Sequence, residues 1–368
     1  MTNDVTVIVE PDPGGHRFQA VANVARVAAR TDDVLLLTSQ VGRSDNAYQV
    51  LLEGAGLELD VEVPFAEIYP PTAQIAAAIA EVCRRRPVAR VVVMDADQSL
   101  KRWWWVARRE LRRLPRRPKV IFMLTRYPAR LQPWDTFGWK LRVAKASLAL
   151  LAMITGTLHR VAGFAGREDM AAGWLVKRVR DPAVCEAHSR DRARLRAEHG
   201  LPPDRRLAGI FGAVTERKNA PLVLAALDAA GGEIDLLLAG GLSDEVAAWL
   251  DGLPAERRDR VLTRDGFLPD KVLDELVACV DVVPIALTNN GPSGIMGKAL
   301  AAGVPVVTAG SQVRAREVRA TGGGVAAEVD ADSMGAAVLR VLDPAWSPQG
   351  RVSLPTADEF AEVLLGVR

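Results

Sequence analysis

The chain has 368 residues, of which 49% are hydrophobic and 25% charged, and its 47 Lys and Arg nearly balance 45 Asp and Glu. A chain this apolar can bury enough surface to offset the entropy lost on folding, so the composition excludes a disordered or low-complexity protein. The length predicts two domains. The three cysteines and four histidines are scattered, which excludes a disulfide framework and the usual zinc site and favours a reducing compartment.

The sequence suggests neither a secretory signal at the N-terminus nor a membrane-spanning segment. Asp4 stands where a secretory signal needs a basic residue, and Glu10 and Asp12 interrupt the apolar run that follows. The longest nearly apolar stretch, residues 146–158, is shorter than the roughly 20 residues that cross a bilayer. The sequence therefore predicts a cytoplasmic protein.

In the first half, short β-branched runs alternate with helix-like segments. This alternation predicts βαβ units and a parallel sheet. Strands are expected at residues 5–9, 34–37, 90–94 and 120–124, and helices at 18–30, 47–55, 73–85 and 99–113.

The second half repeats the alternation. Strands are expected at residues 206–211, 234–239, 280–285 and 304–307, and helices at 221–229, 244–250, 270–279 and 294–302. Pro182 follows a point where the pattern resets, so the joint is placed there. We expect an α/β fold with Rossmann-like domains at residues 1–180 and 181–345, and a tail of residues 346–368 whose helix packs back on the first domain.

A glycine loop, Gly14-Gly15-His16, follows the first strand and opens the first helix. Glycines there let a ligand approach the backbone, and free amides at a helix start favour an anion or a polar sugar. The loop is not a dinucleotide fingerprint. His16 stands at the carboxyl end of a strand, where open α/β sheets bind ligands, and is expected to be catalytic. A purely structural turn is the alternative.

Basic charge is concentrated between Arg84 and Lys145, where 18 Lys and Arg face four acidic residues. The stretch includes Lys101-Arg102-Trp103-Trp104-Trp105. Tryptophan suits a lipid headgroup boundary and arginine pairs with phosphate, so a basic helix on a membrane surface is one interpretation. A solvated basic face with two tryptophans packed inward is the other. Nucleic-acid binding is disfavoured because no reading motif accompanies the charge.

Within this stretch, Asp95-Ala96-Asp97 resembles a metal-binding pattern only in its letters. It lies in the first domain, at a strand end. We expect Asp97 to cap the helix that follows, and no metal site.

The segment from Gly212 to Asn219 follows the first strand of the second half. Arg217 and Lys218 are adjacent at a helix start, so they can grip a diphosphate: Arg offers a planar fork and Lys a point charge. An exposed basic loop is the alternative.

The most informative segment is residues 289–307, which reads as loop, helix, glycine stop and buried strand. Ser293, Gly294 and Ile295 stand at the predicted helix start, where main-chain amides face a phosphate. The end of the helix at Gly303 is a typical C-cap before a strand.

In order and spacing, these pieces resemble the retaining nucleotide-sugar glycosyltransferases of the GT-B fold. The resemblance covers most of the second half and, more loosely, the glycine loop of the first. It implies two Rossmann-like domains facing a cleft, with the acceptor bound by the first domain and the nucleotide-sugar by the second.

Individual roles carry over only in part. The family's diphosphate-binding lysine falls on Lys218, and its arginine falls on Ala213, with Arg217 as the replacement. The family's paired glutamates fall on Asn290 and Lys298. Asn290 can still bond a sugar hydroxyl, but Lys298 cannot accept a hydrogen bond from ribose.

The resemblance predicts a metal-independent, retaining glycosyltransferase. Its predicted catalytic residues are Lys218, Arg217 and His16, and its predicted donor-binding residues are Gly14, Gly15, Gly212, Asn290, Gly291, Ser293, Gly294, Ile295 and Lys298. A sugar-nucleotide epimerase and a catalytically degenerate nucleotide-binding module are the alternatives. The basic first domain favours an anionic or lipid-linked acceptor and work at the inner membrane face, and a small polar acceptor is equally open.

Overall fold

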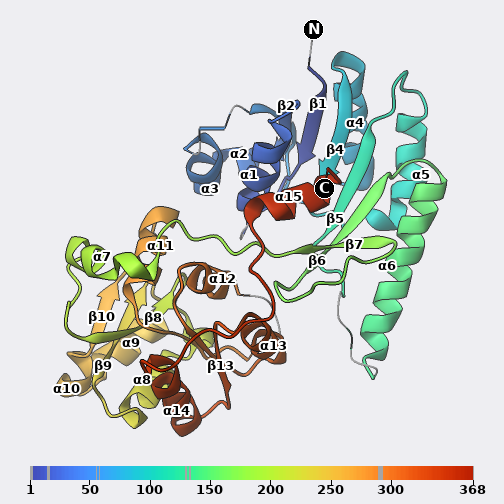
Figure 1. Cartoon of the computed structure of the whole chain (residues 1–368). Coiled ribbons are helices and arrows are strands. Elements are labelled where there is room, and N and C mark those ends of the chain that lie inside the picture. Colours follow the sequence, from blue (N-terminus) through green and yellow to red (C-terminus); the bar gives the residue numbers. More distant parts are fainter. Residues whose placement is uncertain are drawn as a thin grey trace. The chain divides into compact units, whose positions relative to one another are not determined.

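The computed structural model describes residues 3–14, 17–54, 56–57, 59–128, 131, 134–288 and 293–367. The chain divides into two compact units, each built on a parallel sheet (Figure 1). Unit 1 comprises residues 1–165, 169–181 and 356–368, and unit 2 comprises residues 166–168 and 182–355. No helix among the described residues has both the length and the apolar character needed to cross a membrane.

The described residues of unit 1 form seven parallel strands in the order β3-β2-β1-β4-β5-β6-β7. β1 is buried at every position, as a strand covered on both faces should be. The strand order reverses beside β1, which creates a switch point between β1 and β4. The strands are β1 Val5–Val9, β2 Asp33–Ser39, β3 Asp60–Phe65, β4 Val88–Val93, β5 Lys119–Leu124, β6 Arg160–Ala165 and β7 Val176–Arg180.

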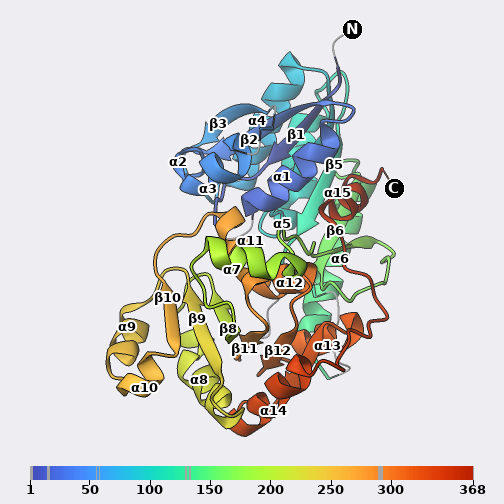
Figure 2. The ribbon, with the colours of Figure 1, turned by 60° about the vertical axis from the view of Figure 1, so that its left-hand side comes forward.

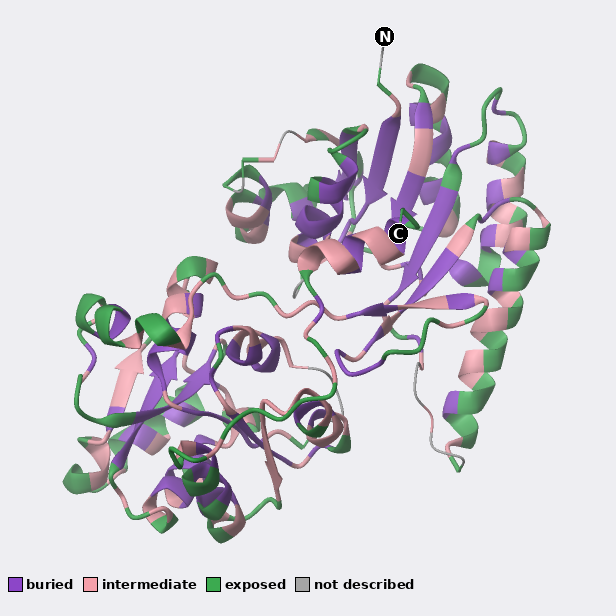
Figure 3. Ribbon diagram, viewed as in Figure 1, coloured by how far each residue is buried: buried purple, intermediate pink, exposed green. Residues whose placement is uncertain are grey.

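Helices cover both faces of this sheet and enclose two cores (Figure 3). One core is covered by α4 (Thr72–Arg85), α5 (Leu100–Leu111) and α6 (Thr136–Ile154). The opposite core is covered by α1 (Arg17–Ala28), the short segments α2 (Gln40–Ser44), α3 (Asn46–Tyr48) and a π-helix over Gln49–Glu53, and the C-terminal helix α15 (Ala357–Leu365). The final helix thus packs on unit 1, against α1.

Unit 2 repeats the plan, with six parallel strands in the part of it that the structure describes. A bridge between Ala208 and Val282, with the Gly209 amide 3.0 Å from the Val282 carbonyl, joins two three-stranded sheets into the order β10-β9-β8-β11-β12-β13. The switch point lies between β8 and β11. The strands are β8 Arg206–Phe211, β9 Ile234–Ala239, β10 Val261–Arg264, β11 Val283–Ile285, β12 Val306–Ala309 and β13 Gly324–Ala327.

The helices of unit 2 also cover both faces. Figure 2 shows α8 and α14 side by side on one of them. That face carries α8 (Ala220–Ala229), α9 (Asp244–Asp251) and α14 (Ala331–Leu342), and the other carries α7 (Arg192–Glu198), α11 (Asp270–Cys279), α12 (Gly294–Ala301) and α13 (Gln312–Thr321). Short turns of helix lie at Ser189–Asp191, Glu216–Lys218 and Ala255–Arg258 (α10).

The three consecutive tryptophans at the start of α5 have different environments. Trp103 is fully buried, stacks edge-on against Phe122 of β5 and donates from its indole nitrogen to the Thr157 carbonyl at 2.9 Å. Trp105 is 52% exposed, with the Arg109 guanidinium over its ring. Trp104 is partly buried and packs against the same core as Trp103. Two of the three tryptophans therefore face inward, as the second interpretation expects, and Trp105 faces solvent.

These environments predict opposite effects of substitution. Trp103→Ala removes a core side chain and leaves the Thr157 carbonyl without its donor, so we expect a loss of about 3–5 kcal/mol in the free energy of unfolding. Trp105→Ala should change it by less than about 0.5 kcal/mol. Urea denaturation of the two variants checks this, and equal losses would contradict the assignment.

Candidate functional site

The loop after β8 returns a lysine to the end of its own strand. Gly212 follows β8 with φ +75°, a left-handed conformation that favours glycine. The turn over Glu216–Lys218 then brings the Lys218 ammonium back to donate to the Phe211 carbonyl. Gly212 and Lys218, both predicted site residues, therefore meet at the carboxyl end of β8.

Lys218 is largely buried, and none of the described carboxylates pairs with it. Burial, and secondarily the positive charge of Arg217, lower the pKa of Lys218 to about 8. Arg217 itself is exposed. A buried cation without a counter-ion is costly to the fold, and an anion at that position would relieve the cost.

Asn219 ends the loop and begins α8. It has φ 50°, the left-handed region, and its side-chain oxygen accepts from the Leu222 amide at 3.3 Å. Asparagine tolerates this conformation better than most residues. Sequence reasoning gave Asn219 no role, although an Asn-Ala-Pro run before a helix is a recognisable cap signal.

The second predicted element, the start of α12, is also built as expected. Ser293 caps the helix, its hydroxyl oxygen accepting from the Met296 amide at 3.3 Å. Gly294 and Ile295 are the first residues of α12, so their amides lie in the turn that lacks intrahelical acceptors, at the positive end of the helix dipole. The predicted residues Asn290 and Gly291 lie outside the described part of the chain.

The sheet topology places these two elements at one edge. β8 and β11 are neighbours, and the Lys218 loop leaves the carboxyl end of β8 while the connection to α12 leaves that of β11. The switch point of an open parallel sheet is where ligands bind. The residues predicted from two distant segments therefore belong to one candidate site of unit 2.

A buried ion pair that the sequence did not reveal packs against α12. Arg167, which follows β6, is fully buried and lies 2.9 Å from Glu317 of α13 and 3.3 Å from the Ser293 carbonyl. A Cβ on Gly297 would come within 2.5 Å of the Arg167 guanidinium. The glycine inside α12 is the one sequence signal of this close approach.

Lys298, one turn along α12, is occupied by a different partner. Its ammonium is 2.5 Å from Asp274 and 3.8 Å from Asp270, both on α11. Burial alone would lower the pKa of Lys298, but the two carboxylates raise it overall. Asp274 also accepts the Glu186 amide at 2.9 Å. Lys298 therefore ties α12 to α11, and its predicted role toward a donor stays a prediction.

The corresponding edge of unit 1 gathers acids around one arginine. Arg17, at the start of α1, lies 2.8 Å from Asp12 and 2.8 Å from Asp95, which follows β4. The Gly14 amide donates to Asp12 at 2.8 Å, so the carboxylate shapes the predicted glycine loop. Its other two predicted members, Gly15 and His16, lie outside the described residues.

Glu10 is the deepest member of this group and is fully buried. One carboxyl oxygen accepts the Asp12 amide at 3.0 Å and is 3.7 Å from Arg17. Burial raises the pKa of Glu10 to about 8, outweighing the opposing effect of Arg17. Near neutral pH, Glu10 is therefore largely protonated, with a proton to donate at the switch point.

Asp97 does not cap α5, contrary to the expectation above. It accepts from the Thr125 hydroxyl and the Arg126 amide, both at 3.0 Å, and from Lys145 at 2.5 Å. These donors, from the end of β5 and from α6, hold the carboxylate away from the start of α5, which Ser99 precedes. Burial would raise the pKa of Asp97, but the Lys145 hydrogen bond lowers it overall.

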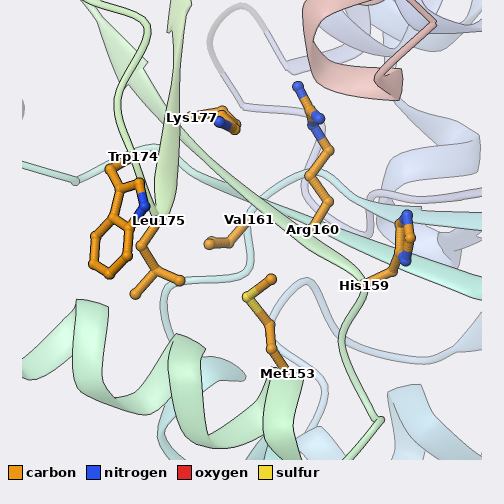
Figure 4. A pocket seen from close by; sticks show the side chains of 7 residues that line it. All are labelled: Met153, His159, Arg160, Val161, Trp174, Leu175 and Lys177. Atoms are coloured by element: carbon orange, nitrogen blue, oxygen red, sulfur yellow. The ribbon is translucent and has the colours of Figure 1, made fainter.

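A cavity of about 260 Å³ lies elsewhere in unit 1, at the amino ends of β6 and β7 (Figure 4). It is far along the strands from the carboxyl-edge residues described above. The apolar side chains in its wall are Met153, Val161, Trp174 and Leu175. The basic residues in its wall are His159, Arg160 and Lys177. None of the predicted site residues contributes to it.

Comparison with known proteins adds evidence on the fold. No family model and no curated protein sequence matches the chain. Solved structures do match over nearly its whole length. HepE of Anabaena in complex with UDP aligns with a TM-score of 0.58 and 14% identity, covering 98% of this chain and 94% of that one.

Two further structures widen the functional range of this fold. Sucrose-phosphate synthase of Thermosynechococcus elongatus aligns with a TM-score of 0.59 and 16% identity, over 99% of this chain and 94% of that one. A protein described as a putative UDP-N-acetylglucosamine 2-epimerase of Listeria monocytogenes aligns with a TM-score of 0.57 and 12% identity, over 100% of this chain and 95% of that one. The predicted α/β fold, with the two Rossmann-like domains of GT-B glycosyltransferases, is confirmed, and identities this low show the fold alone.

The contact between Gly297 and Arg167 gives a stability prediction. Alanine usually stabilises a helix by about 1 kcal/mol relative to glycine, but a Cβ here would push on a guanidinium held by Glu317. We expect Gly297→Ala to lower the free energy of unfolding by about 1–3 kcal/mol. Gly252→Ala, whose Cβ would meet its nearest neighbour at 3.5 Å, is the control and should be neutral. Equal unfolding midpoints for the two variants would contradict the crowding.

Glu10 gives a pH prediction. The folded protein keeps the Glu10 proton up to about pH 8, whereas the unfolded chain releases it near the ordinary glutamate pKa of 4.5, so stability falls as pH rises between these values. The slope from this one group is at most about 1.4 kcal/mol per pH unit. Glu10→Gln should remove that part of the decline, and exposed Glu81→Gln should not. Unfolding curves at about pH 5, 6, 7 and 8 measure how the free energy of unfolding of each variant changes with pH.

Proposed function

We propose that this protein is a glycosyltransferase that moves a sugar from a nucleotide-sugar donor to an acceptor, with retention of the anomeric configuration. The observation that carries the proposal is the partly buried Lys218 ammonium, without a carboxylate partner among the described residues, at the carboxyl end of β8. Its position at a switch point suits a ligand phosphate. HepE, which shares the fold, was solved with UDP, and this supports a UDP-type donor.

The diphosphate is the group that this site would stabilise. In the proposed step, the bond from the anomeric carbon to the diphosphate oxygen breaks, and both electrons go to that oxygen. The acceptor oxygen bonds to the same face of the carbon, and its proton passes to the leaving diphosphate. Lys218, Arg217 and the first amides of α12 stabilise the negative charge that develops, so the chemistry itself requires neither a metal nor flanking carboxylates.

The remaining predicted residues receive narrower roles. We assign the Gly212 turn and the Ser293 cap to shaping the phosphate site, with Gly294 and Ile295 supplying amides. We keep Asn290 and Gly291 as donor contacts and Lys298 as a residue that orients α12 through Asp274.

In unit 1, we propose that the carboxyl edge binds the acceptor. The carboxylates of Asp12 and Asp95 offer acceptors to a hydroxyl-bearing molecule, and the buried Glu10 holds the loop by accepting the Asp12 amide. Gly14, Gly15 and His16 belong to the same loop. The three free cysteines, far apart in sequence, fit our proposal of a cytoplasmic location.

Incubation with UDP-, GDP- and dTDP-sugars tests the proposal against its two alternatives. A glycosyltransferase without acceptor should slowly hydrolyse its donor and release the nucleoside diphosphate. An epimerase, the alternative supported by the likeness to the Listeria structure, should change the sugar without releasing nucleotide. Nucleotide binding with no product after long incubation would leave the degenerate binding module as the function.

Lys218→Met is the sharpest single substitution. We expect donor hydrolysis to fall by about 10²–10³-fold, since one preorganised group at the developing charge is lost. The free energy of unfolding at neutral pH should stay equal or rise, because the variant no longer buries an unpaired cation. Exposed Lys271→Met is the matched control and should alter neither quantity.

The same lysine predicts how nucleotide affinity depends on pH. Lys218 of the free protein loses its proton near pH 8, so UDP binding should weaken as pH rises above that value. A thermal-shift titration of parent and Lys218→Met measures this, since ligand at 100 times its Kd stabilises by about 2.7 kcal/mol. A parent whose affinity is unchanged up to about pH 10, or a variant that keeps full affinity, would overturn the assigned role.

A further inference from the structure

Helix α6 leaves an unusual amount of apolar surface in contact with solvent. It has 19 residues, of which three, Gly138, Ala149 and Ala152, are buried. Phe137 is 76% exposed and Ile154 is 74% exposed, and Val143 and Leu150 are also exposed. Single exposed hydrophobic residues are ordinary, but a continuous set marks an interaction surface.

The helical spacing places most of these side chains on one outer stripe. Trp139, Val143, Leu150 and Ile154 recur at intervals of four, seven and four residues, so they share a face. The buried residues Gly138, Ala149 and Ala152 fall on the opposite face. At 1.5 Å per residue, the stripe runs along a helix of about 28 Å. Figure 3 shows how little of α6 is buried compared with the other elements of its unit.

The helix that packs against α6 is rich in positive charge. α5 packs against α6 on the same side of the sheet. Together the two helices contain seven Lys and Arg and one acid, Glu110, which already pairs with Arg84 at 3.5 Å. Among the described carboxylates, none pairs with Lys101, Arg102, Arg109 or Lys140.

Exposed tryptophans also lie near both ends of α6. Trp134 precedes the helix and is 77% exposed. At the other end, exposed Trp174 lines the cavity beside Met153 of α6, and the walls of that cavity include His159 and Lys177 (Figure 4). A mixed wall of this kind suits an apolar chain next to a phosphate. Tryptophans at two ends of an apolar helix are typical of proteins that rest at a lipid headgroup boundary.

We propose that the outer face of α5 and α6, the α5–α6 face, binds an anionic lipid surface, with the α6 stripe among the acyl chains and the cations of α5 at the phosphates. The positive charge of this face favours an anionic bilayer over a second copy of the chain. A second copy of the chain would bring the same unpaired cations together and be repelled, whereas an anionic bilayer neutralises them. The proposal does not depend on the transfer reaction.

The test is co-sedimentation of the full chain with vesicles of phosphatidylcholine alone or mixed with phosphatidylglycerol. We expect binding to the mixed vesicles, weakened by salt, and little binding to phosphatidylcholine. The triple variant Val143→Ser, Leu150→Ser, Ile154→Ser should bind at least about tenfold more weakly. Replacing Lys101 and Arg102 by Gln should cost about fivefold per residue.

A matched control comes from unit 2. Phe267, Val329 and Leu339 are exposed to similar extents, and their triple replacement by Ser should leave vesicle binding unchanged. Circular dichroism melting shows whether each variant is folded. Equal vesicle binding by the two triple variants, absence of binding by the parent, or a concentration-dependent dimer that only the α6 variant loses would each overturn the proposal.

Discussion

The placement of polar residues in both units follows from one constraint of open parallel sheets. The strand order reverses beside the first strand, so the connections that leave the two central strands diverge and expose the strand ends between them. In unit 2, the single bridge between Ala208 and Val282 makes β8 and β11 neighbours and thereby brings the Lys218 loop and the start of α12 to one edge. In unit 1, the same reversal brings Glu10 and Asp95 to Arg17.

The two edges carry opposite chemistry with a common physical feature. Lys218 is a cation whose pKa is lowered by burial, and Glu10 is an acid whose pKa is raised by burial. Both shifts favour the neutral form, so each group is held in an environment that is costly for its own charge. In a structural ion pair such as Arg167 with Glu317, the opposite charge of the partner offsets the cost of burying each charge. Lys218 and Glu10 keep shifted pKa values in the free protein, and such shifts are common at functional positions.

The predictable part of this protein was local in sequence. Apolar β-branched runs located strands such as β1 and β8 almost to the residue, and Ser-Gly after a strand located the start of α12. Long-range pairing was not predictable. The residues around Lys298 in the sequence do not indicate that it pairs with Asp274. The residues around Asp97 likewise do not indicate that it pairs with Lys145. β3 and β13 are half-exposed edge strands, and their hydrophobic patterns were too weak to predict a strand. α6 was not predicted because many of its apolar residues face outward.

The C-terminal helix has a consequence for biosynthesis. Phe360 and Leu364 of α15 belong to the second core of unit 1, and Arg30 of the first connection pairs with Asp358 at 2.5 Å. A ribosome makes β1 before unit 2 and α15 after it, so one face of the unit 1 sheet stays incompletely covered until unit 2 has been synthesised. During translation, unit 1 therefore becomes complete only after unit 2 has been made, and a product truncated before α15 would have an open core.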